Sequence, residues 1–223
     1  MSIQPSTLSF LTDLRQNNNR EWFNDHKERY IAAHADFKNF IQMMIDRLAE
    51  FDLHINTSID PGKCMFRIYR DVRFSKNKDP YKNWLAAGIS IDGRKLDGPE
   101  YYLHIEPEGK SFIASGYWRP KKEHLDAIRQ EIDYNAKGLL DALQDGGWSV
   151  DDLSAEDKLV RPPAGYTADH PHIEILKLKS FILYEAIPDD VLTSAKALDH
   201  IIAVCRRIYP FKEFLHEATT LID

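Results

Sequence analysis

The sequence predicts a single α+β domain over residues 1–223, with helices packed on one side of a mainly antiparallel sheet and a long N-terminal helix. Three observations support this fold class. Apolar residues recur every three or four positions near the N-terminus, alternating strand-like runs follow in the middle, and helical periodicity returns towards the C-terminus. The runs in the middle are joined by short turns, and such turns favour antiparallel neighbours because a parallel crossover needs a dozen or more residues.

Two helices are predicted in the N-terminal part. Ser6 can cap a short first helix, and the asparagines at 17–19 end it. Asn18, with Glu21 three residues later, fits a capping box for a second helix that runs to about Phe51. Its apolar residues form one stripe, which indicates a buried face. The stripe consists of Trp22, Phe23, Tyr30, Ala33, Phe37, Phe40, Met44 and Leu48.

Alternating residues in the middle of the chain predict the strands. The runs are residues 64–69, 85–91, 100–106 and 111–118, and a further strand is predicted at 181–186. The third and fourth runs are separated by a four-residue loop that contains Gly109 and is typical of a hairpin.

The remaining helices are predicted from capping residues and periodicity. Pro120 suits the first turn of one helix, and a shorter helix follows at about 139–143. Ile173 begins a helical turn, Ser194 can cap a helix that reaches Ile208, and Pro210 is expected to start a separate final helical segment.

Composition excludes several classes of protein. No run of about 18 apolar residues exists, and the N-terminus lacks the pattern of a secretory signal, so neither a membrane span nor secretion is expected. Cys64 and Cys205 are too few for a disulfide framework or a multi-cysteine zinc site, which indicates a reduced, cytoplasmic protein. A net charge of -6 argues against general coating of nucleic acid, although a local basic face can still bind a phosphate chain.

Positive charge gathers in one segment of this acidic chain. Residues 61–82 hold seven cations and only two acids, and this excess suggests a site that receives an anion. The cations are Lys63, Arg67, Arg70, Arg73, Lys76, Lys78 and Lys82.

Four segments together resemble a known family. They are FLTDLRQNNNREWF, FRIYRDVRFSKNKDPYK, YYLHIEPEGKSF followed by GYWRP, and GYTADHPHIEILKLKSF, and they span most of the chain. The combination resembles the domain of unknown function 2461 family. The resemblance implies a compact single α+β domain and carries no reaction, cofactor or catalytic residue. It does mark motif positions, among which are Arg67, Arg70, Asp71, Arg73, Lys78, Pro80, Tyr81, Lys82, Tyr102, His104, Asp169 and His170.

The cationic segment can act as one site only if the chain folds back. Arg67 and Arg73 would lie roughly 20 Å apart in an extended strand, too far to hold one phosphate. A return through residues 75–79, stiffened by Pro80, would bring Lys78 or Lys82 near Arg70 or Arg73. Such a loop could bind phosphate or carboxylate. The predicted ligand-binding residues are Arg67, Arg70, Arg73, Lys78, Tyr81, Lys82 and Tyr102. The alternative is an internal salt-bridge network with nearby acids.

Proton transfer has two candidate positions. Tyr102, His104 and Glu106 share one face of a predicted strand, and the ordinary pKa of His104 suits a general acid or base. An ordinary polar face on a half-exposed strand is the alternative. Asp169 and His170 are the second candidates. With His172 they would still need a ligand from elsewhere to hold a metal, so no metal site is predicted.

Two functions follow as hypotheses. The first is binding or turnover of a small anionic metabolite, bearing phosphate or carboxylate, through the Arg/Lys-rich loop. The second is a non-catalytic module that contacts nucleic acid or an acidic partner through the same loop. A purely structural role for the cations is the third possibility. The sequence identifies no cofactor and does not decide whether the protein is an enzyme.

Overall fold

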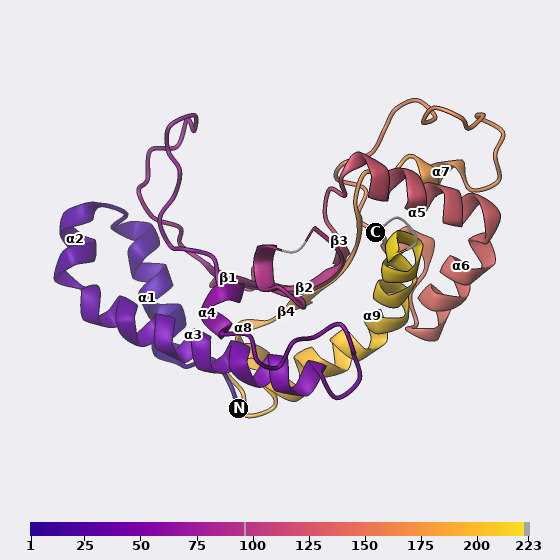
Figure 1. Cartoon of the computed structure of the whole chain (residues 1–223). Coiled ribbons are helices and arrows are strands. Elements are labelled where there is room, and N and C mark those ends of the chain that lie inside the picture. The colour runs from indigo at the N-terminus through magenta and orange to yellow at the C-terminus, as the bar shows by residue number, and fades with distance from the viewer. Residues whose placement is uncertain (96, 221–223) are drawn as a thin grey trace. The chain divides into compact units, whose positions relative to one another are not determined.

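The computed structural model describes residues 1–95 and 97–220, which fall into two compact units (Figure 1). The first unit contains Met1–Lys95, Tyr102–Ile113 and Glu185–Ala203. The second contains Leu96–Tyr101, Ala114–Tyr184 and Val204–Asp223. The expectation of a single domain over residues 1–223 stays a prediction.

A four-stranded antiparallel sheet confirms the predicted α+β class. Its strands are β1 (Leu85–Ile89), β2 (Glu100–Ile105), β3 (Ser111–Tyr117) and β4 (Phe181–Ile187), and they are hydrogen-bonded in that order. Short connections explain why β1 pairs with β2 and β2 with β3, whereas β3 and β4 pair across a long helical segment, residues 118–180. β2, β3 and β4 each contribute residues to both units.

Helices of the first unit surround an apolar core. They are α1 (Pro5–Gln16), α2 (Arg20–Asp25), α3 (Lys27–Leu48), α4 (Pro61–Cys64) and α8 (Asp189–Leu192), with a 3₁₀ turn, η1, at Gly93–Lys95. The long N-terminal helix is present as α3, which packs against α1 and β1 and buries the predicted stripe from Ala33 to Leu48. The chain breaks at His26, so the helix predicted from Asn18 is two helices.

The predicted capping box at Asn18 is wrong because that side chain has a long-range partner. Asn19 caps α2 instead, and its side chain accepts the Trp22 N–H at 2.9 Å. The Asn18 amide makes two hydrogen bonds with the backbone of Tyr81, donating to the carbonyl at 3.0 Å and accepting the N–H at 3.1 Å. This pair fixes the base of the cationic segment to the start of α2.

The cationic segment forms an irregular hairpin over residues 66–82, here called the cationic hairpin (Figure 1). Its arms are joined by the backbone bonds Arg70 N–H to Pro80 O and Lys82 N–H to Ile68 O, at 2.9 and 2.7 Å. A regular strand at 64–69 was predicted and is wrong: Cys64 ends α4, and the segment beyond it makes only isolated bridges. The chain nevertheless folds back as the site hypothesis requires.

Helices of the second unit are α5 (Lys122–Tyr134), α6 (Ala136–Asp145), α7 (Ile173–Leu176) and most of α9 (Ala197–Thr220), with a 3₁₀ turn, η2, at Val150–Asp152. Pro210 lies inside α9 and does not begin a new helix. Ile208 and Phe211 are fully buried on either side of it, and this burial offsets the hydrogen bond that proline removes. No helix in the described part of the chain is long and apolar enough to cross a membrane.

Candidate functional site

An aromatic–cation cluster lies at the base of the cationic hairpin and consists of Phe66, Lys82, Trp84 and Arg94. The Lys82 ammonium nitrogen is 4.5 Å from the Trp84 ring centroid and 5.6 Å from that of Phe66. The Arg94 guanidinium carbon is also 5.6 Å from the Phe66 ring centroid. Aromatic ring faces attract cations, so the rings hold both side chains in place without neutralising them.

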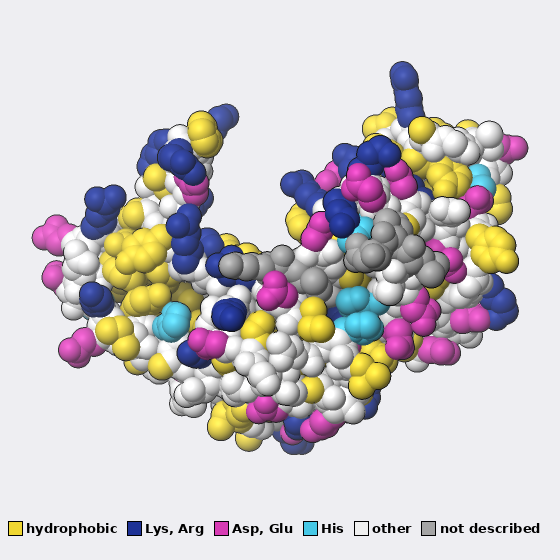
Figure 2. Space-filling view, viewed as in Figure 1, with side chains coloured by type: hydrophobic (Ala, Val, Ile, Leu, Met, Phe, Trp, Pro, Cys, Tyr) yellow, Lys and Arg dark blue, Asp and Glu magenta, His cyan; other side chains and the backbone are white. Residues whose placement is uncertain are grey.

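Mutual repulsion marks the cluster as electropositive. Burial lowers the pKa of Lys82, and the positive charges of Arg67, Arg94 and Arg70 lower it further. Among the described residues, no carboxylate lies within ion-pair distance of Arg67, Lys82 or Arg94, and Arg70 lies 3.9 Å from Asp79. Figure 2 shows Lys and Arg side chains gathered over the hairpin and its base, on the left of the view. The internal salt-bridge alternative therefore accounts for Arg70 and Arg73 but not for Lys82 or Arg94.

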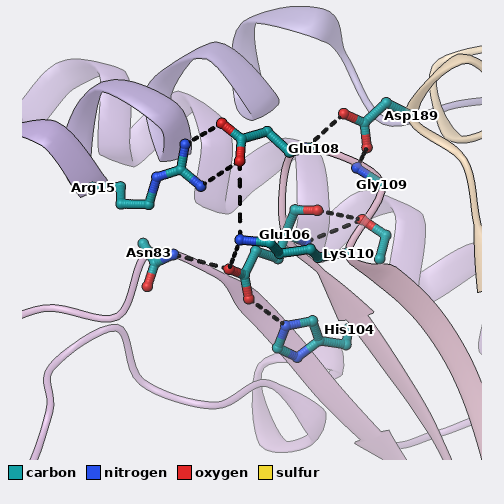
Figure 3. Close-up of polar contacts among 9 residues, drawn as sticks. Arg15, Asn83, His104, Glu106, Glu108, Gly109, Lys110 and Asp189 are labelled. Atoms are coloured by element: carbon teal, nitrogen blue, oxygen red, sulfur yellow. Dashed lines mark hydrogen bonds and ion pairs between the residues drawn. The ribbon is translucent and has the colours of Figure 1, made fainter.

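A row of hydrogen-bonded side chains continues along β2. Tyr102 Oη lies 3.3 Å from His104 Nδ1. His104 Nε2 lies 3.2 Å from Glu106 Oε2 (Figure 3). Asn83 donates to the other oxygen of Glu106 at 3.1 Å. Alternation along the strand puts these side chains on one face, as predicted from the sequence.

His104 is held almost out of solvent between aromatic rings. It is 9% exposed, its ring stacks on Phe112 with centroids 4.9 Å apart, and its centroid is also 4.9 Å from that of Trp84. Burial lowers the pKa of His104, while the Glu106 carboxylate acts in the opposite direction. A neutral imidazole between a phenol and a carboxylate can accept or donate a proton at neutral pH.

The two groups of side chains are contiguous within the first unit. Trp84 contacts both Lys82 and His104, and the Phe66 ring meets Tyr102 edge-on with centroids 5.9 Å apart. The fold thus brings together cations, aromatic faces and a proton-carrying side chain. This combination can bind an anion and, in addition, move a proton.

The turn after β2 is fixed from two sides (Figure 3). The N–H groups of Glu108 and Gly109 donate to the Asp189 carboxylate at 2.8 and 3.1 Å. Arg15 pairs with the Glu108 carboxylate through both terminal nitrogens, and this pairing lowers the pKa of Glu108. Glu108 has a φ of 70°, which an L-residue rarely adopts. These contacts hold the strained turn and so fix the end of the strand that carries Glu106.

Arg73 and Lys78 lie on the outer part of the hairpin and have local partners. Two Arg73 nitrogens donate to the Asp71 carboxylate at 3.0 and 2.6 Å, and this arginine lowers the pKa of Asp71 to about 2. Lys78 donates to the Val72 carbonyl at 3.0 Å. Phe74, between them, is 96% exposed. The predicted cations therefore separate into a base group, Arg67, Arg70 and Lys82, and an outer group.

Tyr81 anchors the hairpin. Its ring is buried and stacks on Phe23 with centroids 4.0 Å apart, and its backbone pairs with Asn18. We therefore interpret Tyr81 as a support for the neighbouring Lys82 and not as a ligand contact.

Asp169 and His170 belong to the second unit, where His170 has two polar partners. Its Nε2 lies 2.9 Å from the Asp133 carboxylate, and its Nδ1 accepts the His172 N–H at 3.1 Å. A hydrogen bond to the Thr167 side chain lowers the pKa of Asp169, which is exposed. These contacts favour a role for His170 in holding the loop before α7. Within residues 1–95 and 97–220, no group of three or more His, Cys, Asp or Glu side chains could hold a metal ion.

Sequence reasoning missed Phe66, Trp84, Arg94 and Phe112. Trp84 follows Lys82 by two residues, and side chains two apart share a face in an extended chain, so this contact could have been predicted. Arg94 lies in η1, and nothing in the sequence indicates that it returns to the ring of Phe66.

Comparison with known proteins gives a family and no further relatives. A search of the curated proteins and a search of the solved structures each found no match. The family model described as "Conserved hypothetical protein (DUF2461)" matches residues 6–214, nearly the whole chain. The motif positions of the hairpin and of β2 lie inside this match, and the chain belongs to the DUF2461 family.

Proposed function

We propose that the protein binds a small metabolite bearing phosphate or carboxylate at the aromatic–cation cluster. The observation that carries the proposal is Lys82, whose ammonium group lies over Phe66 and Trp84 and makes no ion pair with any described carboxylate. An anion there would relieve the repulsion among Lys82 and the neighbouring arginines. The guanidinium groups can add bidentate hydrogen bonds to the oxygens of the bound phosphate or carboxylate.

Two further features refine the proposal. Phe66 and Trp84 are only partly buried, and aromatic rings beside cations favour a ligand that has a planar ring as well as an anionic group, such as a nucleotide. The hydrogen-bonded row from Tyr102 to Glu106 supplies proton transfer if the ligand is also turned over. A cytoplasmic location is part of the proposal and is supported by the low cysteine content, since the chain has only Cys64 and Cys205.

A thermal-shift screen against phosphorylated metabolites, nucleotides and carboxylates tests the proposal. A ligand at a hundred times its Kd adds about 2.7 kcal/mol to the free energy of unfolding. For a chain of this size that corresponds to a rise in Tm of about 5–11 °C. We expect Lys82→Met and Arg94→Met each to reduce the rise.

Arg73→Met is the matched control because Arg73 is a cation of the same hairpin, and its partner is Asp71 at the outer end. It should leave the rise intact. The proposal fails if no anion shifts the wild-type Tm, or if the same anion shifts the Lys82→Met and Arg94→Met variants as much as the wild type.

The outer hairpin supports a second candidate function, a non-catalytic contact with nucleic acid or an acidic partner. Phe74 is almost fully exposed between Arg73 and Lys78, and aromatic rings next to cations are typical of single-strand binding surfaces. Binding of a labelled oligonucleotide should then fall steeply with salt and be weakened by Phe74→Ala. Binding that is unchanged in this variant would remove the second candidate.

A further inference from the structure

Lys82 differs from the other lysines of the hairpin in its surroundings. Its ammonium nitrogen makes no hydrogen bond or ion pair with any residue that the structure describes, and its contacts are the two aromatic rings. Lys76 and Lys78 are both exposed, and Lys78 donates to the Val72 carbonyl. Lys82 is half-buried, and the nearest charges that act on it are those of three arginines, Arg67, Arg94 and Arg70.

Burial and the neighbouring arginines make Lys82 easier to deprotonate than an exposed lysine. Removing water from around a lysine and placing cations beside it both disfavour the protonated form, and enzymes use the same two effects to obtain a nucleophilic lysine. The pKa of Lys82 is accordingly lowered, with burial as the larger cause. A lysine that served only to attract an anion would bind better if it stayed fully charged.

We propose that Lys82 is a nucleophilic amine that forms an imine with a carbonyl compound carrying a phosphate or carboxylate group. This inference rests on the proposed function, since the neighbouring arginines would bind the anionic group and bring the carbonyl carbon to Lys82. It adds to that function a class of substrate, aldehydes and ketones with an anionic group, and a covalent step. Compounds with an anionic group and no carbonyl would bind without reacting.

The covalent step balances without any further reactant. The neutral nitrogen attacks the carbonyl carbon, the new C–N bond gives a carbinolamine, and the C–O bond then breaks to release one water molecule. Both hydrogens lost from the nitrogen leave with that water, after proton transfers through solvent or through His104, whose ring contacts the same Trp84. Neither oxidation nor reduction occurs in this step, so no redox cofactor is needed.

Pyridoxal phosphate is a suitable probe because it joins an aldehyde, a phosphate group and an aromatic ring. The full chain is incubated with limiting probe, reduced with borohydride at intervals to fix any imine, and mapped by peptide mass spectrometry. Pyridoxine phosphate, which has an alcohol in place of the aldehyde, is the matched ligand for binding alone. Lys82→Arg and Lys78→Arg are the matched variants.

We expect modification of Lys82 to be at least about tenfold faster than that of Lys78 in the same wild-type molecules, because binding places the aldehyde beside the amine. Pyridoxine phosphate should raise the Tm and slow this modification. The fast reaction should disappear in Lys82→Arg and persist in Lys78→Arg. Because both lysines are compared within wild-type protein, the test does not depend on the folding of a variant.

The other outcomes separate the two proposals. If pyridoxine phosphate raises the Tm and Lys82 reacts no faster than Lys78, the nucleophile is refuted and anion binding stands. If Lys82 reacts fast and pyridoxine phosphate neither competes nor raises the Tm, the anionic group does not guide the reaction, and the inferred substrate class is refuted. If neither effect is seen, both the inference and anion binding of this probe class fail.

Discussion

Glu100 gives the sharpest prediction for stability. It is the first residue of β2 and belongs to the second unit, and its Oε2 is buried without a hydrogen-bond partner among the described residues. Burial raises the pKa of this carboxyl from 4.5 to about 7. Below pH 4.5 the group holds its proton in both folded and unfolded chains. Between pH 4.5 and 7 only the folded chain holds it, so stability falls as pH rises through this window and levels off above it.

Glu100→Gln keeps the shape of the protonated side chain and cannot ionise. At 1.36 kcal/mol per pKa unit, the raised pKa corresponds to about 3 kcal/mol of stability lost once Glu100 is charged. Most of this loss occurs between pH 5 and pH 8. We therefore expect the free energy of unfolding of Glu100→Gln, relative to that of wild type, to be about 2–3 kcal/mol higher at pH 8 than at pH 5. The corresponding change in the Tm difference is about 4–12 °C.

The assay is the Tm of both proteins across pH 4–9 by differential scanning calorimetry. Glu123→Gln, an exposed glutamate on α5 of the same unit, is the matched control and should show no such pH-dependent gain. If the difference in Tm between Glu100→Gln and wild type is the same at pH 5 and at pH 8, the reasoning about a buried, neutral Glu100 is refuted.

Two further substitutions test the packing of the second unit. Gly116→Ala should lower the free energy of unfolding in urea by more than about 4 kcal/mol, because φ is 133° and an added Cβ would lie 2.0 Å from the Phe181 carbonyl oxygen. Gly109→Ala is the control: an added Cβ there meets open space at a φ of 69°, and the loss should be only about 1 kcal/mol. Equal losses in the two variants would show that the contact with Phe181 does not matter. Arg129→Met should lower the free energy of unfolding by about 2–4 kcal/mol, since the buried guanidinium donates at 2.8 and 3.2 Å to the carbonyl groups of Leu176 and Leu178. Lys122→Met, at an exposed position of the same helix, is the control. An Arg129→Met protein as stable as wild type would show that those carbonyls find other partners.

Local patterns in the sequence predicted most of the elements. The alternation in residues 100–118 gave β2, the turn and β3, because a strand with one buried face needs a period of two. The stripe from Ala33 to Leu48 likewise predicted α3. Expectations failed where a distant partner overrode a local signal, as at Asn18, whose amide pairs with Tyr81, and at Pro210, which burial keeps inside α9.

The candidate site could be predicted only in part. The charge of the hairpin, the motif positions and the shared face of Tyr102 and His104 are all visible in the sequence. Which cations act together is not visible, since Arg73 and Lys82 look equivalent in a list of residues. The structure separates them because Arg73 finds Asp71 two residues away, whereas Lys82 lies over the rings of Phe66 and Trp84.

Residue types and their spacing are enough to give the family, the α+β class and the position of the cationic segment. Tertiary structure alone decided that the hairpin base meets Arg94 and the aromatic face, and that Lys82 has no carboxylate partner among the described residues. The physical reason is that the charge state and reactivity of a lysine depend on the water and charges around it. Those surroundings come from segments that only folding brings together.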